Sequence, residues 1–199
     1  MAKFFTADWH LSEKKTPNTW SYHRDFDSPE QMNDCIIQKI NKFVGEDDEL
    51  YVLGDVAVDP NCEYWLQQIK CKNMYLIMGD KDDTKKYEWV KEIYPKYFKS
   101  PWSDVMKVQI STLPDKELIL SHKPSDAAHY LNQTINAATP KESLFGLFGH
   151  THRAKAMSVN KNMLSVSCDL WDYVPLSEER IAHLFGAVTK YWDAEVYNY

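Results

Sequence analysis

The sequence lacks cysteine pairs, long apolar runs and an excess of positive charge, and each absence argues against a class of protein. Its four cysteines (Cys35, Cys62, Cys71 and Cys168) form no C-x-x-C pair, so we expect reduced thiols in a cytoplasmic protein. No apolar run approaches the roughly 20 residues of a membrane span, and no charged-then-apolar signal segment opens the chain, so we expect no membrane partner. A net charge of -6 argues against binding to extended nucleic acid, which needs a basic surface.

The composition is that of an ordinary globular protein. The 199 residues are 44% hydrophobic and 26% charged, which allows a sizeable core and argues against disorder. We find no repeat, linker or low-complexity segment. The sequence therefore predicts a single domain over residues 1–199.

Five apolar, strand-like segments each end at a carboxylate or an imidazole. The segments are residues 4–7, 50–53, 74–78, 118–120 and 144–148. The metal-ligand residue types that follow them are Asp8, His10, Asp55, Asp80, His122, His150 and His152. Ligands bind outside the carboxyl ends of strands in open α/β sheets, so we expect these side chains to lie together. The alternative is a set of ordinary polar residues at strand ends.

The stretch His150-Thr151-His152 is the centre of this pattern. In an extended backbone, residues two apart point to the same side, so both imidazoles could meet one metal ion. Such a pair on its own is more often incidental, and the partners at the other strand ends are what make the metal hypothesis strong.

The remaining chain divides into a helical first half and a strand-rich second half. Helices are predicted over residues 28–45, 59–69, 85–94 and 126–134 and from residue 177, with Ser28 as an N-cap and Pro95 as a stop. Further strands are predicted at residues 105–110, 154–159 and 163–167. Two sheets packed face to face with helices outside would satisfy both halves.

Residues 11–27 form a long polar segment directly after His10, rich in basic and aromatic side chains. Such a segment beside a metal site could hold a phosphate and stack on a ring, although a solvated surface loop explains it equally well. Lys15, His23 and Arg24 in this loop, with Arg153 directly after His152, are the candidate substrate contacts.

The order of motifs resembles the calcineurin-like metallophosphoesterases, in particular their small bacterial and phage members. The motifs are Asp8-x-His10, Gly54-Asp55, Gly79-Asp80-Lys81-Asp82, Ser121-His122 and Gly149-His150-Thr151-His152, and residues 169–177 look like the end of the same small members. The resemblance implies an α/β fold, a four-layer α/β/β/α sandwich with two mixed β-sheets. It also implies a two-metal site: Asp8, His10 and His152 hold one ion, Asp80, His122 and His150 hold the other, and Asp55 bridges them.

The implied cofactors are two divalent metal ions per chain. Imidazole and carboxylate ligands make manganese our first expectation, with iron, zinc, nickel or magnesium as alternatives. The implied reaction is attack of a metal-bridging hydroxide on phosphorus. We expect a phosphodiesterase rather than a phosphomonoesterase, acting on a small phosphodiester or nucleotide, and an oligomer stays open.

The departure from the family pattern lies at residues 80–82, where the usual motif is Gly-Asn-His-Asp. Asp80 stands in place of the Asn ligand, and Lys81 in place of the His that protonates the leaving group. We take Lys81 and Asp82 as catalytic candidates and expect Asp80 and Lys81 to compensate each other in charge. One alternative is that Lys81 merely pairs with Asp82 or Asp83 in solvent. A separate alternative for the function is that the chain is a catalytically weakened binding or scaffold module.

Overall fold

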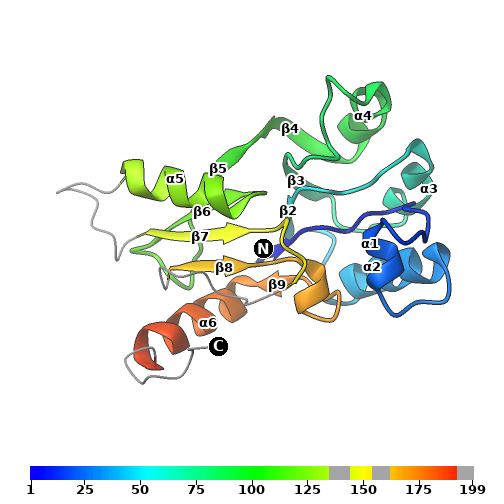
Figure 1. Ribbon diagram of the computed structural model, residues 1–199. Helices are drawn as coiled ribbons and strands as arrows, with labels where there is room; N and C mark the ends of the chain where they lie inside the picture. The colour runs from blue at the N-terminus through cyan, green and yellow to red at the C-terminus, as the bar shows by residue number, and fades with distance from the viewer. Residues whose placement is uncertain (135–143, 154–161, 192–199) are drawn as a thin grey trace.

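Two mixed β-sheets form the centre of the computed structural model, which describes residues 1–134, 144–153 and 162–191 (Figure 1). The first sheet has the order β4-β3-β2-β1-β9, and only β9 runs antiparallel to its neighbour. Its strands are β1 (Lys3–Thr6), β2 (Glu49–Leu53), β3 (Asn73–Ile77), β4 (Phe98–Ser103) and β9 (Leu176–Ser177).

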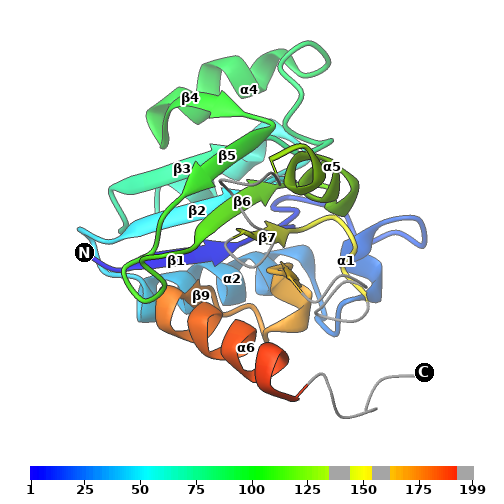
Figure 2. The same cartoon turned by 90° about the vertical axis from the view of Figure 1, so that its left-hand side faces the viewer.

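The second sheet has the order β5-β6-β7-β8, with β5 antiparallel to β6 and the other pairs parallel. Its strands are β5 (Val105–Val108), β6 (Glu117–Ser121), β7 (Leu144–Phe148) and β8 (Met163–Ser165). Figure 2 shows β5, β6 and β7 crossing in front of the first sheet.

Helices cover the outer faces of both sheets. They are α1 (Trp20–His23), α2 (Pro29–Phe43), α3 (Glu63–Leu66), α4 (Glu88–Ile93), α5 (Pro124–Thr134) and α6 (Glu178–Tyr191), with 3-10 turns at Pro60–Cys62, Tyr94–Lys96 and Cys168–Leu170. Ser28 caps α2 as predicted, because its side chain accepts from the backbone N–H of Gln31. None of the helices in the described part of the chain is long and apolar enough to cross a membrane.

The alternation of side chains along the strands builds separate cores on either side of each sheet. In β2, Leu50 and Val52 pack with the helices α2, α3 and α4, whereas Tyr51 and Leu53 pack into the core between the sheets. In β6, Ile119 faces the other way, into a third core with α5. This arrangement confirms the predicted four-layer α/β/β/α sandwich.

Two strands, β4 and β9, were not predicted from the sequence, and one predicted strand lies outside the described residues. β4 contains Pro101, which removes a ladder hydrogen bond, and it forms the edge of its sheet, where proline is tolerated. β9 is only two residues long. The α-helix α4 ends at Ile93, before Pro95 as predicted, and Pro95 lies inside the 3-10 turn that follows it. The strand predicted at residues 154–159 lies outside the described residues.

Candidate metal centre

The seven predicted ligands lie together where the carboxyl ends of β1, β2, β3, β6 and β7 meet. Three groups of ligand atoms each lie within 4.8 Å of one another. They are Asp8 with His10 and His152, Asp80 with His122 and His150, and Asp8 with Asp55 and His122. The sequence-based expectation that these strand ends converge therefore holds in the structure.

The group Asp8, His10 and His152, here called the buried half-site, is closed off from solvent. These residues are 0%, 1% and 4% exposed. The Nε2 atoms of His10 and His152 face each other at 3.1 Å, and His152 Nε2 lies 3.9 Å from Asp8 Oδ1. Burial raises the pKa of Asp8 well above its usual value, and burial lowers the pKa of His152 to about 4.

The group Asp80, His122 and His150, here called the open half-site, faces solvent on one side. The side chains of Asp80 and His150 are 48% and 43% exposed, whereas that of His122 is 3% exposed. His150 Nδ1 lies 3.3 Å from His122 Nε2 and 3.7 Å from Asp80 Oδ2. A ligand from solution can therefore reach this half-site directly.

Asp55 stands between the two half-sites. Its Oδ2 lies 3.5 Å from His10 Nε2, and its Oδ1 lies 3.5 Å from His122 Nε2. One carboxylate thus turns one oxygen towards each half-site, which is the geometry that a bridging ligand needs.

Five of the seven candidate ligands adopt an unusual backbone conformation. Asp8, His10, Asp55, His150 and His152 all have a positive φ between 48° and 69°. The prediction that His150 and His152 meet one metal ion through an extended backbone is therefore wrong, because both residues have a positive φ and they belong to different half-sites. Strained conformations of this kind concentrate at functional sites, where the surrounding structure enforces them.

Glycines at two loops allow the strand ends to approach closely. Gly54 has a φ of +81°, and a Cβ there would lie 2.6 Å from His122 Nδ1. A Cβ on Gly149 would lie 2.6 Å from Ala7 Cβ and 3.0 Å from Asp8 Oδ2. Any side chain at these positions would push the two sheets' ligands apart.

Acceptors behind the imidazoles fix which nitrogen of each ring carries the proton. His10 Nδ1 lies 3.1 Å from Glu13 Oε1, His152 Nδ1 lies 2.8 Å from Asp169 Oδ2, and His122 Nδ1 lies 2.8 Å from the carbonyl oxygen of Leu53. Each Nδ1 therefore donates, and each Nε2 presents a lone pair to the centre.

This tautomer pattern fits bound cations. Two Nε2 lone pairs facing each other at 3.1 Å cannot hydrogen bond to one another, and Asp8 and Asp55 add two carboxylates beside them. A divalent ion between these donors would accept the facing lone pairs and would also neutralise the charge of the carboxylates. The donor set, nitrogen with carboxylate oxygen, suits a transition metal.

Arg24 does not occupy the position of a substrate contact. It is 4% exposed, and its guanidinium donates to both oxygens of Asp169, at 2.7 and 2.9 Å, and to the backbone carbonyls of Asp8 and Trp9. The substrate role predicted for Arg24 is therefore wrong in geometry, because every donor is turned inward. Arg24 instead holds Asp169 and the Asp8 loop in place behind the ligands.

Asp82 is also turned away from the centre. It is 0% exposed and accepts from the backbone N–H groups of Asp55, Val56 and Gly79 and from the hydroxyl of Tyr94. Burial raises the pKa of Asp82 to about 7. Its predicted catalytic role does not fit this position, and it acts as a brace that joins the loop after β2 to the loop after β3.

The charge compensation predicted between Asp80 and Lys81 is not what the structure shows. Asp80 Oδ1 pairs with Lys123 Nζ at 2.6 Å, and Lys81 contributes its backbone N–H to Asp55 Oδ1 at 2.9 Å. Burial by itself would raise the pKa of Asp80, but the hydrogen bond and charge of Lys123, together with His122 and His150, outweigh burial, and the pKa is lowered.

The other predicted substrate contacts lie at the surface around α1. Lys15 donates to the carbonyl of Phe26, and the ring of His23 packs edge-on against that of Trp20. The Arg153 guanidinium lies 5.5 Å from the centroid of Trp20, which stacks on His152 at 3.9 Å with an interplanar angle of 10°. Of these residues, Arg153 is tied most directly to the ligands.

Sequence reasoning missed the residues that orient the ligands. They are Glu13, Trp20, Lys123 and Asp169. Glu13 follows His10 by three residues and Lys123 directly follows His122, so proximity in sequence could have indicated both.

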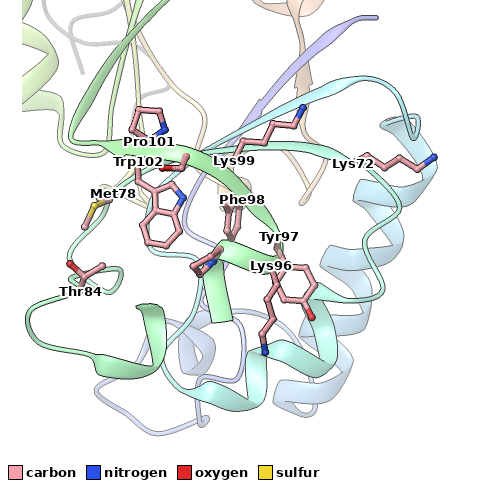
Figure 3. Close-up of a pocket in the computed structure, with 11 residues that line it drawn as sticks. Lys72, Met78, Thr84, Lys96, Tyr97, Phe98, Lys99, Pro101 and Trp102 are labelled. Atoms are coloured by element: carbon pink, nitrogen blue, oxygen red, sulfur yellow. The ribbon is translucent and has the colours of Figure 1, made fainter. Parts of the chain in front are cut away.

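A hollow of about 660 Å³ lies elsewhere, along the edge strand β4, with Met78, Tyr97, Phe98 and Trp102 among its walls (Figure 3). None of the seven ligand residues lines it. The hollow is therefore separate from the candidate metal centre.

A family model described as "Calcineurin-like phosphoesterase superfamily domain" matches residues 7–167. No curated protein sequence matches the chain. The matched range includes all seven ligand residues.

Two solved structures are similar to this one. A protein of unknown function from Aquifex aeolicus, AQ665, has a TM-score of 0.69 and 21% identity over 92% of this chain and 98% of its own. A candidate 5'-nucleotidase from Staphylococcus aureus has a TM-score of 0.41 and 12% identity over 83% of this chain and 48% of its own. The first shows that the fold is shared, and the second is too distant to support an argument.

Proposed function

Because this chain belongs to the calcineurin-like phosphoesterase superfamily, we propose that it is a metal-dependent phosphodiesterase that hydrolyses a small phosphodiester or nucleotide. The observation that carries this proposal is the position of Asp55, which turns one oxygen towards His10 and the other towards His122. A single carboxylate between two sets of imidazoles favours two divalent ions over one.

The buried half-site would hold one ion through Asp8, His10 and His152, and the open half-site the other through Asp80, His122 and His150. When bound, two such ions supply Lewis acidity, an activated water and neutralisation of charge on the phosphoryl oxygens. Manganese remains the first choice, with iron, zinc, nickel or magnesium as alternatives.

The protein's own residues orient the imidazoles of this centre and provide positive charge for the phosphate. Glu13 and Asp169 keep the proton on Nδ1 of His10 and His152, so that both Nε2 atoms are free to ligate. The open half-site admits the phosphate, since the Asp80 and His150 side chains are 48% and 43% exposed. Arg153, exposed at the edge of the site, remains the proposed contact for a phosphate oxygen.

Lys81 decides which substrates suit the site. It stands where the family has a histidine that protonates the leaving group, and an ammonium is a poorer general acid than an imidazolium near neutral pH. We therefore infer a preference for diesters with good leaving groups over monoesters with poor ones.

The test is hydrolysis of bis(p-nitrophenyl) phosphate and of p-nitrophenyl phosphate with added Mn²⁺, with His122→Ala as the control. We expect turnover of the diester that exceeds turnover of the monoester and that His122→Ala abolishes. Turnover no higher than that of the control would contradict the proposal.

Lys81 also favours a second candidate function, a metal-binding module that kept the fold but lost turnover. That outcome would give stoichiometric metal binding in the wild type with no hydrolysis of either ester.

A further inference from the structure

Lys123 is placed at the open half-site by the start of α5. It directly follows His122, and its carbonyl accepts from the hydroxyl of Ser121 and from the backbone N–H of Asp126 at 2.8 and 3.1 Å. The backbone of Lys123 is therefore fixed beside a ligand, and its ammonium reaches Asp80 Oδ1 at 2.6 Å.

The carboxylates of the centre differ in what holds them. Asp8 accepts from the backbone N–H of His150 at 2.9 Å, and Asp55 accepts from the backbone N–H of Lys81 at 2.9 Å. Neutral backbone donors orient these oxygens without cancelling their charge. Asp80, by contrast, is paired with a side-chain cation.

This difference changes the charge that each ion would meet. Asp8 and Asp55 together carry two negative charges, which one divalent ion in the buried half-site would neutralise. The ligating imidazoles are neutral, so Asp80 is then the remaining anion of the open half-site. The ammonium of Lys123 cancels that charge, and a second ion would enter a half-site of zero net charge.

Building on the proposed function of the same site, we propose that Lys123 is an internal counter-cation that competes with the second metal ion for Asp80. The two half-sites then load in order, the buried one first and tightly, the open one second and more weakly. Binding of the second ion requires the ammonium to leave Asp80 Oδ1, because a divalent ion and an ammonium repel each other at this distance.

The side chain of Lys123 is 39% exposed, so the displaced ammonium has room to move into solvent beside the open half-site. There it can meet the charge of an incoming phosphate as a mobile point charge. The same lysine thus holds the half-site before loading and contacts substrate after it.

The experiment is a calorimetric titration of the metal-stripped full-length chain with Mn²⁺. The variants are Lys123→Met, which removes the charge and keeps the length, Lys123→Arg, which keeps the charge, and Lys81→Met, which removes a neighbouring lysine not paired with Asp80. We expect Lys123→Met to tighten the weaker of two Kd values by roughly three- to tenfold, given the modest strength of part-exposed ion pairs. The tighter Kd should stay within about twofold, as should both values in the two control variants.

Binding of one ion by the wild type and of two by Lys123→Met would also support the proposal. A weaker Kd that is unchanged or raised in Lys123→Met, or an equal tightening of both sites or in Lys81→Met, would overturn it.

The titration measures metal binding and not hydrolysis, so it can fail or succeed independently of the proposed phosphodiesterase activity. Two ions that depend on Lys123 in this way, without hydrolysis of any diester, would leave this inference standing and remove the phosphodiesterase. Absence of Mn²⁺ binding in every variant would remove both.

Discussion

Substitution of Asp169 tests most directly how the side chains of the buried half-site are kept in position. Its Oδ2 accepts from His152 Nδ1 at 2.8 Å and from the Arg24 guanidinium at 2.9 Å, and its Oδ1 accepts from Arg24 Nε at 2.7 Å. Asp169→Asn keeps the shape but removes the charge. The new amide NH₂ group can only donate, so it would face a donor of either His152 or Arg24 without being able to accept its hydrogen bond.

Two effects of Asp169→Asn follow, with different magnitudes. Arg24 is 4% exposed, so its charge loses a buried partner, which costs about 3–5 kcal/mol in the free energy of unfolding. For a chain of this size, that corresponds to a fall in Tm of roughly 6–20 °C. The loss of the acceptor behind His152 should weaken metal binding at the buried half-site by about 10- to 100-fold.

The assay pairs thermal unfolding with a Mn²⁺ titration, and the chain supplies a matched control three residues away. Asp172 pairs with Lys39 at 2.6 Å, but its side chain is 80% exposed, so Asp172→Asn should cost less than about 1 kcal/mol and leave metal binding unchanged. A fall in Tm for Asp169→Asn with an unaltered Mn²⁺ affinity would show that Asp169 only stabilises the fold, and would refute its role in orienting His152.

Three further changes test other parts of the structure. Asp55→Ala should lower the number of Mn²⁺ ions bound per chain, measured by elemental analysis, and an unchanged stoichiometry would exclude bridging. Gly149→Ala should cost about 1–3 kcal/mol in urea unfolding, because its Cβ would lie 2.6 Å from Ala7 Cβ, and a cost below 0.5 kcal/mol would mean that the loop gives way. Glu178 accepts from the backbone N–H and hydroxyl of Ser111 at 2.7 and 2.8 Å and from the backbone N–H of Lys3 at 3.2 Å. Burial raises the pKa of Glu178, but these hydrogen bonds and the charge of Lys3 together outweigh burial and lower the pKa below 4.5. Its stabilisation is therefore present above about pH 4.5 and lost as the pH falls through the folded-state pKa. Glu178→Gln should cost about 1–2 kcal/mol at pH 7 and less at pH 3, and an equal cost at both would contradict the assignment.

The positions of the ligands were predictable because the rule that governs them is simple. Parallel strands end at the same edge of a sheet, so Asp8, Asp55 and Asp80 had to be neighbours once β1, β2 and β3 paired in parallel. The same holds for His122 and His150 after β6 and β7. What the pattern could not provide is how the edges of two separate sheets face each other, which depends on packing in the core between them.

The residues behind the ligands were not predictable in the same way. Asp169 meets His152 across 17 positions and Arg24 across 145. Partners that are brought together only by folding have no characteristic spacing. A basic residue in a polar loop, such as Arg24, is more simply explained as a surface contact until its burial is known.

The prediction for Asp80 failed for a related reason. Lys81 is its neighbour in sequence, but the backbone N–H of Lys81 donates to Asp55, and Lys123 arrives from the other sheet to make the ion pair. Adjacency in sequence is a weak guide where the chain turns sharply after each strand.

The conformations of the ligand residues explain why the same spacing occurs in both sheets. Asp8 and His10 have φ values of 62° and 52°, and His150 and His152 have values of 69° and 48°. In each pair, two residues with left-handed φ values flank a residue without one, Trp9 or Thr151. The two loops share this pattern, and together they bring Asp8, His10 and His152 to the buried half-site. The left-handed region is costly for most residues, but aspartate and histidine enter it more readily than branched or bulky side chains. The residue types that bind metal are thus also those that tolerate the turn, and replacing one by a valine would both remove a ligand and strain the loop that carries it.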